Sequence, residues 1–198
     1  MGRQFSQNIS ALLLVVVLCL TNACSSEGQL IQQFTSDAAE PSARVLFLAG
    51  RDSHGPLAHE HRAGSLLLAE ALRVQHPGYA IDVVYGGWPT DQGLFDGVDA
   101  VVFYCDGGSG HMMVGREAQL EQLLENKVGV VALHYAVEVP RDSRAASAML
   151  AATGGYFETH WSVNPHWRAN FETVPRHKIT KGVKPFSMDD EWYFNMRF

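Results

Sequence analysis

The chain alternates short apolar segments with segments of helical periodicity, and this alternation limits its fold more than any other feature. Apolar runs that stop at glycine or polar residues predict four strands, over 43–50, 80–87, 100–108 and 128–134. Apolar residues at helical spacing predict three helices, over 64–75, 117–126 and 142–155. Strands that are apolar throughout and are joined by helices are typical of a parallel sheet covered on both faces. The sequence therefore predicts an α/β fold of the doubly wound, flavodoxin-like class with a mainly parallel sheet.

The N-terminal part of the chain has the composition of an export signal. Arg3 precedes the apolar run "ISALLLVVVLCL", which is too short to span a membrane and typical of a signal peptide. The following "LTNAC" resembles a bacterial lipobox, so we expect 1–24 to be processed and Cys24 to carry lipid. An uncleaved anchor and ordinary secretion are the alternatives. Residues 25–42 are polar and predict a flexible tether to a domain over 43–198.

Charge and cysteine content exclude several classes of protein. The chain has 15 Lys and Arg against 21 Asp and Glu, a net charge of -6, and lacks the basic patch that nucleic-acid binding needs. Membrane contact is expected only through the lipid, with the domain facing the periplasm or the cell exterior. With Cys19 in the signal and Cys24 lipidated, Cys105 has no partner, which excludes a disulfide scaffold. Association into a homo-oligomer is left open.

Polar residues follow three of the predicted strands at the point where each strand ends. They are His54 and His59 after the first strand, Asp106 after the third, and His134 and Glu138 after the fourth. In open α/β sheets, ligands bind outside the carboxyl ends of the parallel strands. Because these ends meet at one edge of the sheet, we expect the five side chains to form one site, although each histidine taken alone is more often structural.

Two kinds of chemistry suit this group of imidazoles and carboxylates. A divalent metal such as zinc could bind there, with His59 and His134 as the ligands. Without a metal, the same residues offer a general acid and base near neutral pH. His59 and His61 would lie about 200° apart on a helix, so we expect one of them, His61, to face solvent.

Cys105 beside Asp106 raises the alternative of a thiol nucleophile. A thiolate would need a supporting histidine. A small apolar residue that closes a buried strand is the favoured interpretation, and a Cys105-dependent hydrolase is the weaker alternative.

Several motifs together resemble one family. They are "GRDSHGPLAHEHRAGSLLLAEAL", "YCDGGSGH", "GVVALHYAVE", "GGYFETHW" and "HKITKGVKPFSMDDEWYF". In this order they resemble the ThuA-like (trehalose utilisation) domain of the class I glutamine-amidotransferase-like superfamily, over about residues 43–198. The resemblance implies the flavodoxin-like sheet and a role in the metabolism of trehalose or keto-disaccharides, with a small-molecule sugar as partner. Family members continue beyond "DEWYF", so we expect the chain to lack the C-terminal part of the domain.

The resemblance also implies that the chain has lost one activity of the superfamily. True glutamine amidotransferases carry the nucleophile in a Gly-x-Cys-x-Gly turn, where this chain has "ALHYAVE" with His134 in place of the cysteine. Glutaminase activity by the usual route is therefore not expected.

The strand ends and the resemblance together lead to a set of expected roles. The expected catalytic residues are His134, Asp106, Glu138 and Glu191, and the expected substrate-binding residues are His54, His160, Trp161 and Asp190. A non-catalytic carbohydrate-binding or scaffold lipoprotein is the alternative, with Trp161 and Trp167 against a sugar. By residue type alone, both tryptophans would be core residues.

Overall fold

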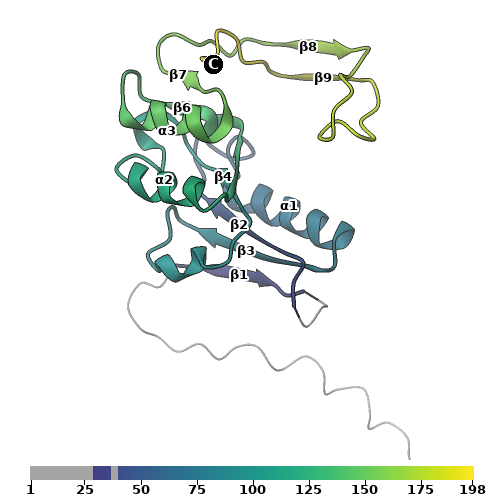
Figure 1. Cartoon of the computed structure of the whole chain (residues 1–198). Helices are drawn as coiled ribbons and strands as arrows, with labels where there is room; N and C mark the ends of the chain where they lie inside the picture. The colour runs from purple at the N-terminus through teal and green to yellow at the C-terminus, as the bar shows by residue number, and fades with distance from the viewer. Residues whose placement is uncertain (1–28, 37–39) are drawn as a thin grey trace, which may run out of the picture.

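The computed structural model describes residues 29–36 and 40–198, which form a five-stranded sheet flanked by helices (Figure 1). The sheet order is β1-β3-β2-β4-β5. Its strands are β1 (Ile31–Phe34), β2 (Ala43–Ala49), β3 (Tyr79–Tyr85), β4 (Ala100–Tyr104) and β5 (Gly129–Leu133). Strands β3, β2, β4 and β5 are parallel, and only β1 runs antiparallel to its neighbour. The predicted α/β class and the four predicted strands are confirmed.

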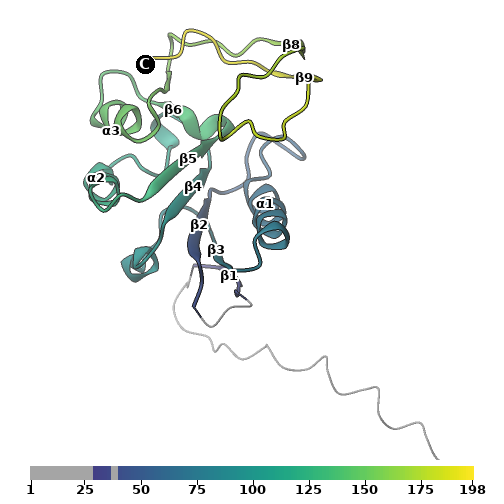
Figure 2. The ribbon, with the colours of Figure 1, turned by 45° about the vertical axis from the view of Figure 1, so that its right-hand side comes forward.

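The three predicted helices are also present, and they cover both faces of the sheet. Helix α1 (His61–Gln75) lies on one face, and α2 (Glu117–Glu125) and α3 (Arg144–Thr153) lie on the other (Figure 2). Ser143 caps α3 by accepting a hydrogen bond from the backbone N–H of Ala146 at 3.1 Å.

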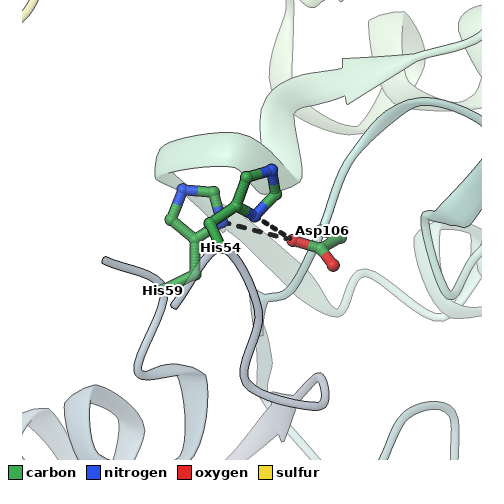
Figure 3. A group of neighbouring side chains, drawn as sticks. All are labelled: His54, His59 and Asp106. Carbon is green, nitrogen blue, oxygen red and sulfur yellow. Dashed lines mark hydrogen bonds and ion pairs between the residues drawn. The ribbon is translucent and has the colours of Figure 1, made fainter. Parts of the chain in front are cut away.

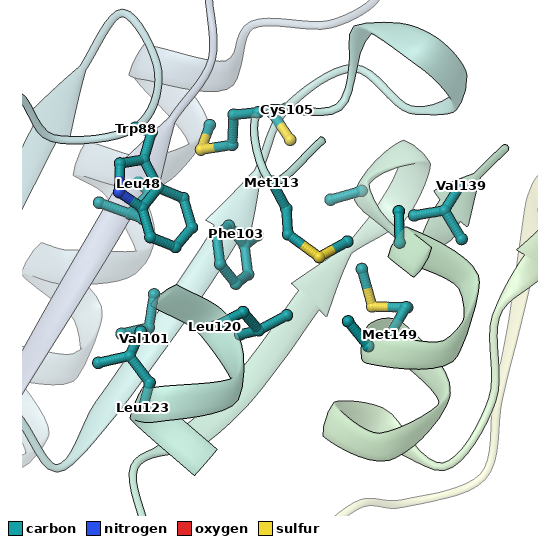
Figure 4. Close-up of a cluster of buried hydrophobic side chains, with 14 of the residues drawn as sticks. Leu48, Trp88, Val101, Phe103, Cys105, Met113, Leu120, Leu123, Val139 and Met149 are labelled. Atoms are coloured by element: carbon teal, nitrogen blue, oxygen red, sulfur yellow. The ribbon is translucent and has the colours of Figure 1, made fainter. Parts of the chain in front are cut away.

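Alternation along β2 explains why both faces are buried. Val45 and Phe47 pack in the cluster beneath α1, whereas Leu46 and Leu48 point to the opposite face. There, Leu48 joins Phe103 and residues of α2 and α3 in the larger of the two cores (Figure 4). A sheet buried on both sides needs strands that are apolar throughout, which is the pattern these strands have.

The segment expected to be a tether contributes a strand instead. Ile31–Phe34 pairs with Ile81–Val84 of β3 along one edge of the sheet. The expectation of a tether over 25–42 is therefore wrong for these four residues. Two of the four are glutamines and most are exposed, as the residues of an edge strand with one neighbour can be. The expected signal peptide and Cys24 lie outside the described residues.

Short elements that the sequence did not predict complete the structure. They are the 3-10 helices η1 (Gln92–Phe95), η2 (Gly108–Gly110) and η3 (His134–Val137) and the strands β6 (Glu138–Val139), β7 (Phe157–Glu158), β8 (His166–Phe171) and β9 (Phe186–Glu191). Strands β8 and β9 form an antiparallel hairpin beyond α3 (Figure 1). In the part of the chain that the structure describes, no helix combines the length and apolar character needed to cross a bilayer.

Candidate functional site

Two glycines bring the ends of three parallel strands into contact. A Cβ atom on Gly50, just after β2, would lie 2.8 Å from Cβ of Cys105 at the end of β4. A Cβ atom on Gly107 would lie 2.5 Å from the carbonyl oxygen of Tyr135, just after β5. Real Cβ atoms do not approach other atoms so closely. Glycine at both positions therefore lets the polar residues that follow the three strands meet, as the sequence predicted.

Asp106 is the centre of the resulting cluster. Its Oδ1 accepts a hydrogen bond from Ser53 Oγ at 2.6 Å. The same oxygen lies 3.3 Å from Nδ1 of His59 and 3.6 Å from Nδ1 of His54 (Figure 3). Burial by itself raises the pKa of Asp106, but the hydrogen bonds from Ser53 and His59 outweigh it and hold that pKa below its usual range. The carboxylate is therefore ionised at neutral pH and attracts cations or donors.

A tight turn after β2 places the two histidines side by side. Ser53 and His59 form an antiparallel bridge, and His54 between them has a φ of 61°, in the left-handed region. The ring centroids of His54 and His59 are 4.1 Å apart. The side chain of His54 is 53% exposed and that of His59 only 13%, so the cluster opens to solvent on the His54 side.

His134 stands at the turn from β5 into η3, with a φ of 53°. Its Nε2 lies 3.1 Å from Nε2 of His59, and its Nδ1 lies 2.9 Å from the phenol oxygen of Tyr193. Burial, followed by the neighbouring His59, lowers the pKa of His134. His134 is therefore neutral at neutral pH and can accept a proton.

These contacts form a continuous hydrogen-bond chain with a defined direction. If Nδ1–H of His59 donates to the Asp106 carboxylate, Nε2 of the neutral His59 ring must accept. His134 then donates through Nε2–H, and its Nδ1 accepts from the hydroxyl of Tyr193. The chain thus runs from Tyr193 through His134 and His59 to Asp106 with every group paired.

His61 is buried against the same carboxylate, contrary to the expectation that it faces solvent. Its side chain is 0% exposed, its Nδ1 donates to the carbonyl oxygen of Arg51 at 2.8 Å, and its Nε2 lies 3.9 Å from Oδ1 of Asp106. The expectation was wrong because the helix begins only at His61. His59 precedes it, so the angular rule for two residues of one helix does not apply to the pair.

The candidate metal ligands that the structure brings together differ from the predicted pair. Nε2 of His59 and Nε2 of His134 lie 3.1 Å apart as a hydrogen-bonded pair. The ligand atoms that do converge belong to His54, His59 and Asp106 and lie within 4.8 Å of one another.

The predicted acidic residues have different surroundings. Glu138 accepts a hydrogen bond from Thr159 Oγ1 at 2.8 Å, so Tyr193 and His59, rather than Glu138, hold the His134 ring. The charges of Glu191 and Asp190, at the end of β9, act to raise the pKa of His134 against the stronger effect of burial. These two carboxylates therefore lie near the site without a hydrogen bond to it.

Two of the predicted substrate-binding residues, His160 and Trp161, lie apart from the cluster. His160 is exposed, and Trp161 is 49% exposed with the guanidinium of Arg197 4.3 Å above its ring. Across residues 40–198, neither makes a hydrogen bond or ring contact with the histidines of the site. Trp167 is 40% exposed, so neither of these two tryptophans is a core residue.

The structure leaves Cys105 without the features of a nucleophile. Its side chain is buried in the core beneath α2 and α3 (Figure 4), and burial raises the pKa of the thiol to about 12. This supports the interpretation of Cys105 as a small apolar residue.

Comparison with known proteins identifies the fold. No protein-family model and no curated protein matches the chain. A crystal structure of a ThuA-like protein from Bacteroides uniformis superimposes with a TM-score of 0.54 at 18% sequence identity. The chain has a ThuA-like fold. The match covers 80% of this chain and 63% of the neighbour, so the chain spans less than two thirds of that protein.

Proposed function

We propose that this chain is an exported ThuA-like enzyme that acts on trehalose or a keto-disaccharide, with His134 as general acid and base. The observation that carries the proposal is the hydrogen-bond chain from Tyr193 through His134 and His59 to Asp106. It stands at the carboxyl ends of parallel strands, where ligands bind in this class of fold. The motifs that resemble the trehalose-utilisation family support a carbohydrate substrate, and the ThuA-like neighbour supports the fold.

The chain of contacts suits proton transfer to and from a sugar. A proton from a sugar hydroxyl enters the His134 ring at Nδ1, where the sugar replaces the hydrogen bond from Tyr193. Nε2–H of His134 stays hydrogen-bonded to Nε2 of His59. The resulting imidazolium is stabilised through His59 by the Asp106 carboxylate, as a carboxylate stabilises a catalytic histidine in hydrolases. The exposed edge of His54 offers the substrate a way in.

Loss of glutaminase activity is part of the same proposal. The strand order β3-β2-β4-β5 supports a doubly wound, flavodoxin-like assignment, in which His134 occupies the turn that would hold the nucleophile. The positive φ of His134 suits the strained turn on which such nucleophiles stand. An imidazole there cannot replace a thiolate, and Cys105 is buried. We expect no release of ammonia from glutamine.

Turnover of trehalose and of 3-keto-disaccharides by the purified chain tests the proposal. The variant His134→Ala should lower kcat/KM by about 10²–10⁴-fold, whereas His177→Ala, an exposed histidine in the loop between β8 and β9, should leave it unchanged. Equal turnover by His134→Ala and the unsubstituted chain would exclude the role of His134. Absence of turnover by both the variant and the unsubstituted chain would exclude a catalytic function toward these sugars.

A non-catalytic carbohydrate-binding protein is the second candidate, and the aromatic surface of the β8–β9 hairpin supports it. The ring of Trp167 lies 5.0 Å from Phe194 and 6.1 Å from Trp192, and Trp167 and Phe194 are about half exposed. Flat aromatic groups beside polar ones suit sugar faces. This candidate predicts saturable sugar binding without product, which Trp167→Ala weakens and His134→Ala does not.

Export and anchoring at Cys24 complete the proposal. The apolar run and lipobox-like segment support them. Incorporation of a labelled fatty acid in cells, abolished by Cys24→Ser, tests the anchor. Labelling that persists in Cys24→Ser would contradict lipidation at this residue.

A further inference from the structure

His61 has a buried nitrogen that the proposed acid–base chemistry leaves without a role. Because its Nδ1–H donates to the carbonyl of Arg51, Nε2 of the neutral ring carries a lone pair. This nitrogen is fully buried and has no hydrogen-bond partner in the described part of the chain. It points at Oδ1 of Asp106, 3.9 Å away, so two electron-rich atoms face each other. A buried acceptor without a donor is costly, and a cation between the two atoms removes that cost.

The distances from the Asp106 oxygen to the surrounding nitrogens are close to those between two ligands of one metal ion. Two ligands each about 2.1 Å from a tetrahedral ion lie about 3.4 Å apart. Oδ1 of Asp106 lies 3.3 Å from Nδ1 of His59, 3.6 Å from Nδ1 of His54 and 3.9 Å from Nε2 of His61. The ligand atoms of His54, His59 and Asp106 lie within 4.8 Å of one another, and Nε2 of His61, 3.9 Å from the same carboxylate oxygen, lies outside this group and joins it by a shift of the side chains when an ion binds. Imidazole nitrogens with a carboxylate oxygen are a ligand set that zinc and cobalt favour.

The neighbours of these residues are arranged as the outer contacts of a metal site commonly are. A histidine ligand usually donates its second N–H to a carbonyl, a carboxylate or another acceptor, which orients the ring. His61 does so toward the carbonyl of Arg51. Nε2 of His59 lies against Nε2 of His134 and can do the same.

We propose that His54, His59, His61 and Asp106 bind one divalent transition-metal ion, with Nε2 of His61 as the buried ligand. The metal takes the lone pair of Nδ1 on His59, so Nε2 of that ring carries the proton and donates to His134. His134 then donates from Nδ1 to the oxygen of Tyr193. Metal binding therefore reverses the direction of the hydrogen-bond chain, and with the ion bound His134 meets the substrate with a proton on Nδ1, as the general acid of the pair of roles proposed above. The inference goes beyond the sugar chemistry, because it does not depend on any substrate.

The test is zinc binding to the purified full chain without an affinity tag, stripped of metal by a chelator. Competition against a chromophoric chelator gives the stoichiometry and the dissociation constant, and Co²⁺ reports the coordination geometry through its visible spectrum. We expect one Zn²⁺ per chain, a tetrahedral Co²⁺ spectrum, and a rise in Tm on addition of zinc.

Matched variants assign the ligands. Asp106→Asn keeps the size of the side chain and removes the charge, and His61→Gln removes the buried nitrogen donor. Each should weaken binding by about 100-fold or more, and His134→Ala, which removes an outer contact, by about 10-fold. His177→Gln should bind zinc like the unsubstituted chain. If His61→Gln fails to fold, Asp106→Asn and the exposed His54→Ala decide the outcome.

Two results would overturn the proposal. One is a folded, unsubstituted chain that takes up no stoichiometric zinc. The other is Asp106→Asn that binds zinc as tightly as the unsubstituted chain. Because the readout is metal and not turnover, either result leaves the test of the carbohydrate enzyme unaffected.

Discussion

The phenol oxygen of Tyr193 lies 2.9 Å from Nδ1 of His134, which joins the segment after β9 to the turn after β5 across 59 residues of sequence. Tyr193→Phe removes this hydrogen bond and keeps the ring packed against Phe157, 5.2 Å away. We expect a loss of about 1 kcal/mol in the free energy of unfolding and faster proteolysis within 172–185. Tyr79→Phe, whose hydroxyl makes no side-chain hydrogen bond in the described residues, is the control. Unchanged stability and cleavage would show that this bond does not hold the hairpin.

Stability should fall in mild acid because of His111. Burial lowers the pKa of His111 in the folded chain from 6.5 to about 4, against the smaller opposing effect of its hydrogen bond to the carbonyl of Ala136. Its Nδ1 accepts from the N–H of Met113, which the neutral ring can do and the protonated ring cannot. Between these values the unfolded chain binds a proton that the folded chain does not, so stability decreases as pH falls through this window. The contribution at pH 5 is a loss of about 2 kcal/mol relative to pH 7.5.

Urea unfolding at the two pH values measures this effect. His111→Gln should be less stable at pH 7.5 and should lose about 2 kcal/mol less on acidification than the unsubstituted chain. His177→Gln, exposed in a loop, should keep the full pH dependence. If His111→Gln lost as much unfolding free energy between pH 7.5 and pH 5 as the unsubstituted chain, the acid sensitivity would belong to other groups.

Phe103 should be among the residues to which the fold is most sensitive. It is fully buried on β4 between Trp88 and His111, with ring centroids 6.0 Å and 5.7 Å away. Phe103→Ala should cost about 3–5 kcal/mol in a denaturant titration. Val131→Ala on β5, where the side chain is 44% exposed, should cost less than about 1 kcal/mol. Similar losses of unfolding free energy for both variants would mean that Phe103 is not buried more deeply than Val131.

A pair of glycines tests the contact between the loops after β4 and β5. A Cβ atom on Gly107 would meet Tyr135 O at 2.5 Å, whereas one on Gly110, in the same turn, would meet nothing within 4 Å. Gly107→Ala should destabilise the chain by about 1–3 kcal/mol, and Gly110→Ala should be nearly neutral. Thermal unfolding of both variants gives the comparison. Equal Tm values would contradict the close approach of the two loops.

Cys105 should resist alkylation in the native chain. Burial raises the pKa of its thiol to about 12, so almost no thiolate exists at pH 7.5. Peptide mapping after iodoacetamide treatment should find Cys105 unmodified in the native chain and modified in urea. Rapid modification of the native chain would instead revive the thiol-dependent hydrolase.

The strands of the central sheet were predictable because burial on both faces requires them to be apolar throughout. The helices that cover the sheet were predictable because each buries one apolar face against it. The strand Ile31–Phe34 was not, because an edge strand with one neighbour needs no apolar pattern and "IQQF" reads as part of a polar segment. The pairing of β8 with β9 was missed for a related reason. Both strands are largely exposed, so their residues carry little periodic signal.

The site divides in the same way. His54, His59, Asp106 and His134 could be brought together from sequence because parallel strands end at a common edge. The role of Tyr193 could not, since its contact depends on how the chain returns after the hairpin. The burial of His61 depends on the residue at which α1 begins, and a shift of one or two residues there is beyond the reach of periodicity.

The close approach at Gly50 also bears on how this pole can change in evolution. A side chain at position 50 would meet Cβ of Cys105 at 2.8 Å and its Cα at 2.9 Å, so even glycine at position 105 would leave a backbone clash. A smaller residue at position 105 therefore cannot make room for a side chain at position 50. Among homologues we expect position 50 to stay glycine while the loop after it varies, so that new specificities at this site arise through changes in that loop.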